Sequence, residues 1–384
     1  GLGARSPQGL CLKSWYHGEN MVIRSVSLKQ FRNYEKLSVD LNRGINILYG
    51  ANAQGKTNFL EAVYFCATGR SKRANTDREL ILFDRGEAHI QLQLEKEGFT
   101  DRLDVHLKRD AKKGVAVNGI AVKKLGDLFG VLYAVIFSPE ELQLIKAGPA
   151  ERRRFMDMEI CQLSAVYYYE LQQYHKILKQ RNQLLKEIQK KRVLKDTLPV
   201  WDEQLAAHGV RVIEKRRAFL QKIDVLSREI HAKITEGKEI LEIIYKPSVS
   251  EEEFGNKLKR NADRDILLGT TTVGVHKDDI QFLINQNDVR VYGSQGQQRT
   301  ASLSAKLAEI DLIKEDQSTT PVLLLDDVLS ELDQSRQKYL MRYIEQVQTI
   351  ITATGAEDIL GKLDNIENIT VFQVENGSIS LTNR

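Results

Sequence analysis

Apolar and polar residues alternate along the first third of the chain, which is the pattern of half-buried β-strands. The alternating runs are residues 22–31, 36–41, 45–49, 88–94, 102–108 and 131–139. Between them, residues 57–68 have the spacing of a helix that ends near Gly69, and Asn118 and Gly119 predict the tight turn of a hairpin. The N-terminal part is therefore expected to be rich in strands.

The pattern changes at about Ala150. From there to residue 192 the chain contains no glycine or proline, and apolar residues recur every three or four positions. This spacing predicts one long helix, about 60 Å in length if it is continuous. After a break at residues 195–199, a second helical segment runs over 201–234. Two long helices joined by a short connection predict an antiparallel helical hairpin.

Strands and helices alternate in the rest of the chain, as they do in an α/β sheet. The expected elements are strands at 239–245, 278–284, 321–327 and 348–354, and helices at 297–313 and 331–347. The unbroken apolar run before Asp326 predicts a strand that is buried on both faces. We therefore expect one α/β body that is interrupted by a helical lobe. Its parts are a leader (1–20), a first part of the body (21–137), a helical insertion (138–262) and a second part of the body (263–384).

Composition narrows the class of protein. The leader lacks the apolar stretch of a signal peptide, and no apolar run approaches the ~18 residues that cross a bilayer. The cysteines Cys11, Cys66 and Cys161 form no CxxC pair, which fits a reducing compartment and argues against a disulfide or zinc framework. The seven histidines are scattered without the spacing of metal ligands. We expect a cytoplasmic protein that has no membrane anchor.

Residues 50–57, GANAQGKT, match the phosphate-loop pattern GxxxxGK[ST]. Gly50 allows a sharp turn after the strand, and backbone N–H groups at the start of the following helix hold phosphates. Lys56 would place its charge on the β and γ phosphates, and the hydroxyl of Thr57 would complete a Mg²⁺ shell. The expected nucleotide-binding residues are Gly50, Ala51, Asn52, Ala53, Gln54, Gly55, Lys56, Thr57 and Asn58. The alternative is a glycine-containing turn with a surface lysine, and the flanking strand and helix favour the phosphate loop.

Two carboxylates end the apolar strand at 321–327. A strand of this kind, lying beside the strand of the phosphate loop, brings a carboxylate to the magnesium ion. Asp326 is the candidate on the metal side, and Asp327 is placed to polarise the attacking water. The alternative is a strand that simply ends in solvated aspartates.

The segment YGSQGQQRT, residues 292–300, has two compatible interpretations. Ser294 and Gln297 fit a capping box at the start of a helix. Ser294 and the N–H of Gly296 also fit a site that faces a γ-phosphate, since the geometry that caps a helix binds anions as well.

Taken together, these motifs resemble a known family. The order GxxxxGKT, SQGQQR about 240 residues later, LLLDD and SELD resembles the ABC-type ATPases of chromosome maintenance and recombination. The segments FRNY, QGKTNFLEA, GRSKR, SPEEL, VHKDD and SQGQQR together resemble the RecF family of bacterial recombination mediators, from Met21 to the C-terminus. The resemblance implies an α/β, ABC-type (SMC-like) P-loop ATPase head with an inserted helical lobe.

The resemblance also implies roles for the motif residues. In this family two heads enclose two ATP molecules, so residues 50–57 would bind ATP within one subunit. Ser294, Gly296 and Gln297 would close over it from the other subunit. The residues implied in catalysis are Lys56, Asp326, Asp327 and Ser294, with Thr57 and Asp326 on Mg²⁺. Asp333 in SELD would lie at the dimer seam, and Arg32 would approach the nucleotide.

The chain departs from the general ABC pattern at three places. Asp327 stands where most members carry glutamate, and the shorter side chain implies slow hydrolysis. No histidine follows the strand at 348–354, so Thr352 or Thr354 occupies the switch region. The segment GVHKDD stands where RecF sequences commonly read GPHRDD, and it leaves His276 and Asp278 with either a role at the interface or the nucleotide or a structural one. The SPEEL segment is the candidate for the glutamine loop.

Family resemblance further implies weak ATP hydrolysis and binding of duplex or gapped DNA, with RecR and RecO as partners in the loading of RecA. The net charge of +4 conceals a basic centre, because residues 151–240 carry +6 and the rest of the chain −2. Candidate phosphate contacts in the helical lobe are Lys176, Lys179, Arg181, Lys186, Lys190, Lys191 and Arg192, and a second patch is Arg70, Lys72 and Arg73. The alternative for the lobe is a solvated helix face. Tyrosines 167–169 fit base stacking less well than core packing.

Two other functions remain open on the sequence alone. One is a P-loop kinase acting on a small molecule, which would need no SQGQQR segment. The other is a structural ATPase head that joins protein partners and ignores DNA.

Overall fold

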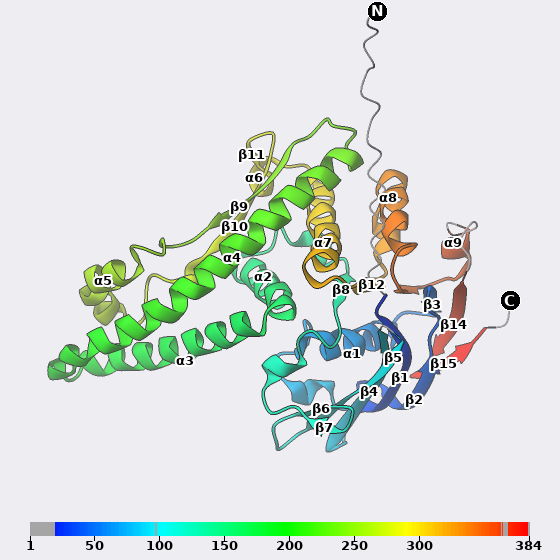
Figure 1. Ribbon diagram of the computed structural model, residues 1–384, viewed down its shortest axis with the longest axis horizontal. Coiled ribbons are helices and arrows are strands. Elements are labelled where there is room, and N and C mark those ends of the chain that lie inside the picture. Colours follow the sequence, from blue (N-terminus) through cyan, green and yellow to red (C-terminus); the bar gives the residue numbers. More distant parts are fainter. Residues whose placement is uncertain (1–19, 97, 362, 364–367, 383–384) are drawn as a thin grey trace, which may run out of the picture.

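The computed structural model describes residues 20–96, 98–361, 363 and 368–382. Residues 1–19 of the expected leader lie outside the described residues, and Asn20 forms an isolated bridge with Thr320. A head built on two sheets lies on the right in Figure 1, and a helical lobe projects to the left.

The first sheet holds the phosphate loop. Its strand order is β15-β14-β3-β13-β12-β8, and all neighbours are parallel except β15 with β14. The strands are β3 (Ile45–Tyr49), β8 (Ala134–Phe137), β12 (Val322–Asp326), β13 (Thr349–Ala353), β14 (Ile369–Glu375) and β15 (Ser378–Leu381). β12 was expected to lie beside β3, and this is wrong because β13 lies between them. The carboxyl ends of parallel strands still meet at one edge of the sheet, so Asp326 comes close to the loop after β3.

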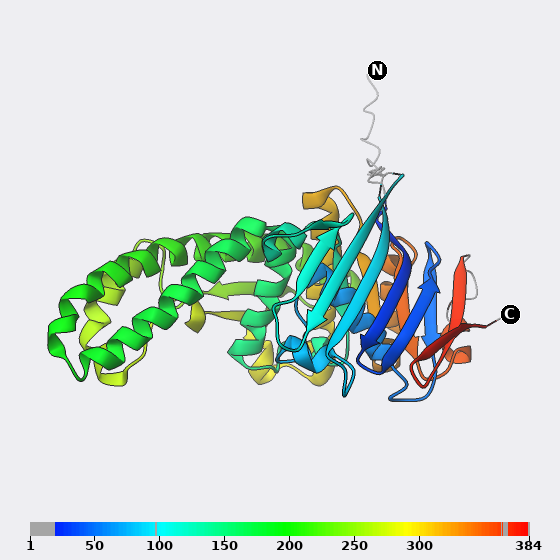
Figure 2. The same ribbon diagram turned by 90° about the horizontal axis from the view of Figure 1, so that it is seen from below.

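The second sheet is antiparallel, in the order β2-β1-β4-β5-β6-β7. Its strands are β1 (Val22–Phe31), β2 (Tyr34–Asp40), β4 (Glu87–Lys96), β5 (Phe99–Lys108), β6 (Gly114–Val117) and β7 (Ile120–Ala121). Asn118 and Gly119 both have positive φ, at 53° and 79°, as the expected hairpin turn requires. Helix α1 (Lys56–Thr68) contacts strands of both sheets, and because it lies between them it is buried on nearly every side. Figure 2 shows this sheet in front of the head.

The helical lobe differs from the expected single long helix. Instead, α2 (Pro149–Leu163) and α3 (Ala165–Ile188) are separate helices, because Ser164 has extended backbone angles of φ −149° and ψ 103°. The hydroxyl of Ser164 accepts a hydrogen bond from the N–H of Tyr167 and so caps α3. The predicted hairpin is present, since α3 packs on α4 (Leu198–Ile234).

Three strands and one helix complete the lobe. A three-stranded sheet is formed by β9 (Leu241–Lys246), β10 (Asp279–Ile284) and β11 (Asn287–Asp288), and α5 (Phe254–Leu268) packs on α3 and α4. The boundary expected after residue 262 falls inside α5. The division into lobe and head stays a proposal, and its second boundary is better drawn after Asp288, where β11 ends.

Four α-helices of the described chain lie in its C-terminal third, after β11. They are α6 (Val289–Tyr292), α7 (Gln295–Gln317), α8 (Gln334–Ile344) and α9 (Glu357–Leu360). α7 is largely buried and packs on α4 and β8. α8 begins three residues later than expected, because Asp333 caps it and accepts a hydrogen bond from the N–H of Arg336. Within the described residues, no helix combines the length and the apolar character that spanning a membrane requires.

Candidate nucleotide site

The loop between β3 and α1 has a backbone that requires glycine at two points. Gly50 has φ 159°, and a Cβ there would lie 2.3 Å from the carbonyl oxygen of Val374. Gly55 has φ 117°, and a Cβ there would lie 2.9 Å from the hydroxyl of Tyr34. The glycines of the motif are therefore needed for the close approach of neighbouring strands as well as for phosphate binding.

A brace that the motif did not predict surrounds this loop. Asn33 donates from Nδ2 to the carbonyl of Gln54 at 2.9 Å, and the Tyr34 hydroxyl donates to the carbonyl of Gly55 at 2.9 Å. From the other side, the N–H of Asn376 donates to Gln54 Oε1 at 2.6 Å. Asn58 Nδ2 donates to Asn33 Oδ1 at 2.9 Å and ties the brace to α1. The FRNY segment therefore shapes the phosphate loop, although its only signal in the sequence was the family resemblance.

Arg32 lies next to this brace but is directed at α1. Its guanidinium forms two hydrogen bonds of 2.8 Å with the carboxylate of Glu61 and one of 2.9 Å with the carbonyl of Glu79. Arg32 has φ 53°, a conformation that costs a non-glycine residue free energy. The Arg32 side chain therefore fixes α1, and its approach to the nucleotide stays a prediction.

Lys56 is buried at the mouth of the loop. Its Nζ donates to the carbonyl oxygens of Gly50 at 2.6 Å and Ala51 at 2.9 Å. Burial lowers the pKa of Lys56, and the carboxylates of Asp327 and Asp326 oppose that shift. A cation held by two neutral carbonyl groups can exchange them for phosphate oxygens, which are stronger acceptors.

Asp326 stands at the centre of the site. Its Oδ1 accepts hydrogen bonds from the hydroxyls of Thr57 at 2.9 Å and Thr352 at 2.8 Å. Burial raises the pKa of Asp326; the two hydrogen bonds oppose this shift and the carboxylate of Asp327 adds to it. A hydroxyl and a carboxylate at this separation fit the two protein ligands of Mg²⁺, which completes its shell with phosphate oxygens and water. Among the described residues, no cluster of three or more His, Cys, Asp or Glu side chains could form a metal cage.

Asp327 has a backbone conformation that is rare for aspartate, with φ 53° and ψ 16°. Its N–H donates to the Thr352 hydroxyl at 3.1 Å, and its carbonyl accepts from Ser330 at 2.8 Å. Thr352 thus bonds both aspartates from β13. Of the two threonines expected in the switch region, Thr352 lies in the site and Thr354 is exposed at the end of the strand.

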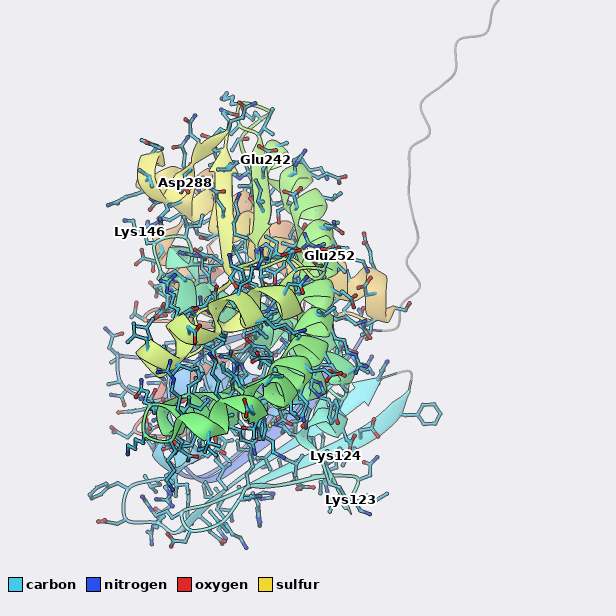
Figure 3. All side chains as sticks on the ribbon, turned by 90° about the vertical axis from the view of Figure 1, so that its left-hand side faces the viewer. Lys123, Lys124, Lys146, Glu242, Glu252 and Asp288 are labelled. Carbon is cyan, nitrogen blue, oxygen red and sulfur yellow. The ribbon has the colours of Figure 1, made fainter. Side chains whose placement is uncertain are left out.

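A cavity of about 850 Å³ opens beside these residues, which is a volume typical of ligand sites. Thr57, Asp326 and Asp327 line one end of it, and residues 138–141 of the SPEEL segment line another. α2 closes the cavity, and Lys146 on its wall is labelled in Figure 3. This position is compatible with the glutamine-loop role expected for SPEEL.

The SQGQQR segment lies outside this cavity. Both hydrogen bonds of the capping box are present: Gln297 N–H to Ser294 Oγ at 3.1 Å, and Ser294 N–H to Gln297 Oε1 at 2.9 Å. The carbonyl of Gly296 accepts from Arg336 at 2.9 Å, and Arg336 also pairs with Asp333. The fold therefore brings Lys56, Thr57, Asp326 and Asp327 together, and no hydrogen bond joins residues 294–297 to the phosphate loop within the described part of the chain.

The VHKDD segment is structural. The Tyr174 hydroxyl lies 2.8 Å from His276 Nδ1, and His276 Nε2 lies 3.0 Å from the carbonyl of Thr271. Burial lowers the pKa of His276 to about 4. Asp278 is fully buried and bonds Arg216 at 2.8 Å. Of the two roles considered for this segment, the structure supports the structural one.

The candidate DNA contacts divide into two groups. Arg181 is fully buried and pairs with Asp202 at 2.7 Å and Asp265 at 2.8 Å, so its proposed contact with DNA is wrong. The other lobe candidates are exposed. In the second patch, Lys72 is turned inward to Glu141 at 2.7 Å. Of the tyrosine cluster, residues 167 and 168 are buried as expected for core packing, and residue 169 is half exposed.

Comparisons with known proteins identify the family of this chain. The model of the RecF/RecN/SMC N terminal domain matches residues 22–380. The chain is 51% identical over 359 residues to the DNA replication and repair protein RecF of Lachnoclostridium phytofermentans, covering 94% of this chain and 99% of the relative. It is 49% identical to RecF of Lachnospira eligens, with the same coverage.

Solved structures give the same result. The recombination mediator protein RecF with ATP, of the RecFOR pathway, has a TM-score of 0.88 and 34% identity, and the match covers 97% of this chain and 100% of that chain. An Smc head domain from Pyrococcus furiosus has a TM-score of 0.53 at 17% identity, with 94% and 96% covered, and this likeness concerns the fold alone. The chain therefore belongs to the RecF family of DNA replication and repair proteins and has the ABC-type ATPase head fold of the SMC group, which replaces the kinase alternative.

Proposed function

We propose that this chain is an ATP-dependent DNA-binding protein of recombinational repair, in which two copies close on two ATP molecules. One observation carries the proposal. Thr57, Asp326 and Asp327 line one cavity with Lys56 beside the two aspartates, whereas the segment 294–297 lies outside it in the same chain. A site that lacks its second set of phosphate donors is incomplete until a second copy supplies them.

The first half of the site would act within one subunit. Lys56 would exchange the carbonyls of Gly50 and Ala51 for the β and γ phosphates, and loop N–H groups would hold the remaining oxygens. Thr57 and Asp326 would hold Mg²⁺, which neutralises charge on the two terminal phosphates when bound. Because Thr352 holds Asp326 at 2.8 Å, the carboxylate is fixed before the nucleotide arrives.

Asp327 would orient the attacking water and accept its proton. Thr352 and Ser330 fix its backbone from two sides, so its carboxylate is directed by a conformation that the neighbouring groups maintain. An aspartate reaches about one methylene less far than the glutamate of most ABC ATPases. Slow hydrolysis is the expected consequence of this shorter reach. We further expect DNA to stimulate the hydrolysis.

The second half of the site would act across the dimer. In the described residues, Ser294 Oγ accepts one hydrogen bond and donates none, so its hydroxyl hydrogen can serve a γ-phosphate. The start of α7 adds the positive end of a 23-residue helix. The γ-phosphate carries its charge on several oxygens, so it would accept hydrogen bonds from both subunits. ATP binding would then be coupled to dimer closure.

DNA and protein partners follow from the relatives. Their role in DNA replication and repair, and the RecFOR pathway of the similar structure, support DNA, RecO and RecR as partners and RecA loading as the outcome. The same role supports a place in the cytoplasm beside the chromosome. The exposed lysines of α3 support binding through phosphates without sequence preference.

Molecular mass in solution tests the dimer. Light scattering on the wild-type protein should give twice the monomer mass with ATP, and the monomer mass with ADP or no nucleotide. Lys56→Met should remain a monomer and lose ATP binding. Ser294→Arg should bind ATP as a monomer, whereas Ser380→Arg, an equal change on the exposed edge strand β15, should dimerise normally.

Two outcomes contradict the proposal. If Ser294→Arg dimerised with ATP as the wild type does, the second half of the site would lie elsewhere. Filter binding of duplex DNA separates the remaining alternative, because a head that joins only proteins would retain no DNA with or without ATP.

A further inference from the structure

A second cavity, of about 620 Å³, lies where the head meets the helical lobe. The end of α1, helix α2 and the first half of α3 form its walls. It adjoins the nucleotide cavity, because Arg154 and Met158 line both. The cations on its wall are Arg70, Arg153, Arg154, Lys176 and Arg216.

Only one carboxylate among the lining residues faces these cations, and it is already occupied. Asp157 accepts two hydrogen bonds from Arg216 Nη2, at 2.8 and 3.1 Å, and one from the hydroxyl of Tyr167. Arg216 is in turn buried and bonded to Asp278. Arg216 thus faces two carboxylates, and these groups add no free positive charge to the cavity.

The other four cations have no carboxylate within ion-pair distance among the described residues. Arg153 donates to the carbonyl of Asp278 at 2.7 Å, and Arg154 donates to the carbonyl of Ser71 at 2.7 Å. Carbonyl oxygens fix a guanidinium in place without neutralising it. Arg70 and Lys176 are exposed at the rim. Four like charges around one concave surface raise the local potential and attract an anion.

The basic surface continues from the cavity along α3. Lys176, Lys179 and Lys186 are exposed, and their spacing of three and seven residues puts them on one face of the helix. Lys190 is exposed just beyond the end of α3. None of these lysines lies within ion-pair distance of a carboxylate in the described chain. The ten residues from Lys176 to Lys186 span about 15 Å, and strand phosphates follow one another at about 3.4 Å.

We propose that this cavity and the lysine face of α3 together bind consecutive phosphates of a nucleic-acid strand. Guanidinium groups fixed by carbonyls suit phosphates in the cavity, since they present paired donors in a rigid plane. The apolar wall, where the rings of Phe129 and Tyr168 lie 5.1 Å apart, gives a sugar or base a surface to contact. The inference rests on the proposed DNA-binding function and assigns it a site.

The salt dependence of DNA binding tests the site. Arg70→Gln/Lys176→Gln removes two rim cations that make no ion pair in the described structure. Binding of a fluorescent duplex and of the same single strand is measured by anisotropy at several salt concentrations. The slope of log Kobs against log salt should become shallower by about 1.8 for the duplex. ATP-driven dimerisation, measured in the same preparation, should remain that of the wild type.

Two controls keep the result specific. Lys123→Gln/Lys124→Gln removes the same charge from exposed lysines that line neither cavity, and Figure 3 labels both at the lower right, far from Lys146. This variant should keep the wild-type slope. Arg70→Lys/Lys176→Arg should also keep it, because the charges remain.

Each outcome has a clear meaning. If the wild type binds no DNA, the proposed function fails. If the wild type binds DNA and the Arg70/Lys176 variant keeps the full slope, or if the Lys123/Lys124 control loses as much, only the assigned site fails. Competition with inorganic phosphate and with a mononucleotide separates the sources of phosphate. Displacement of the DNA probe by millimolar phosphate would identify a site for small anions. It would overturn the proposal that the site binds a nucleic-acid strand.

Discussion

The substitution Lys306→Met is expected to destabilise the protein strongly. Lys306 lies in the middle of α7, fully buried, with its Nζ 2.6 Å from Glu309, 3.4 Å from Glu159 and 3.7 Å from Glu141. Lys72 is the second cation of the cluster and lies 2.7 Å from Glu141. The cluster joins α7, which begins at the SQGQQR segment, to the wall of the nucleotide cavity.

The charges of the cluster set the magnitude. Burial raises the pKa of Glu309 well above its ordinary value, and the neighbouring Glu159 adds to the shift. Lys306 opposes that shift, since its ammonium pairs with Glu309 at 2.6 Å. Methionine at 306 removes this partner and leaves the buried carboxylate of Glu309 unpaired beside Glu159, which costs about 3–5 kcal/mol. That is a large share of the roughly 5–15 kcal/mol that holds a domain folded.

Urea unfolding followed by circular dichroism measures the loss. The midpoint should fall while the slope m stays the same, because the surface exposed on unfolding does not change. The double variant Lys306→Met/Glu309→Met is the matched control. It replaces a salt-bridged pair by apolar chains of similar volume, which is often neutral or stabilising. The double variant should therefore recover most of the lost free energy.

The reasoning has two points of failure. A loss below about 1 kcal/mol in the single variant would mean that water or a rearranged side chain compensates the carboxylate. A double variant as unstable as the single one would mean that packing of α7, rather than charge balance, depends on Lys306.

Three further changes test the site and its surroundings. Asp327→Asn should keep ATP binding but stop phosphate release, so that light scattering finds a dimer that persists with ATP; normal turnover would exclude Asp327 as the water-orienting group. Thr352→Val removes the hydroxyl shared by Asp326 and Asp327, and it should lower the free energy of unfolding by about 1.5–3 kcal/mol and slow phosphate release, whereas Thr352→Ser should restore both. His276 has a pKa lowered to about 4 from 6.5, so in that range the unfolded chain binds a proton that the folded chain does not. Stability should therefore fall as the pH falls through this window, by about 3 kcal/mol in all, and His276→Gln should flatten that part of the urea-midpoint profile.

Much of the site was readable from local sequence. The phosphate loop, the aspartates after an apolar strand and the capping box at Ser294 each depend on residues close together in the chain, and each forms as expected. The hairpin at Asn118 is local in the same sense, because its turn needs only two residues with positive φ. The order of these motifs along the chain resembles that of a known family, and this resemblance predicted the head fold.

Other features depend on contacts between distant segments, and these the sequence could not give. The break at Ser164 was not predicted, because the helical spacing of apolar residues continues across it. The local signal was a serine that can cap a helix, with no glycine or proline nearby to mark the break. Arg181 looks like a surface cation by spacing, yet Asp202 and Asp265 from two other helices bury it. Charge pattern along one helix cannot report an acid that a different helix supplies.

The sequence by itself determined which residues carry the nucleotide chemistry, because that chemistry needs fixed residue types at short spacings. The tertiary structure decided where they meet. It inserted β13 between the two motif strands, brought Thr352 from that strand to both aspartates, and placed Asn33 and Asn376 around the phosphate loop. It also set the SQGQQR segment apart from the cavity of its own chain. Strand order and helix packing arise from the burial of apolar faces over the whole molecule, so no short stretch of the chain contains that information.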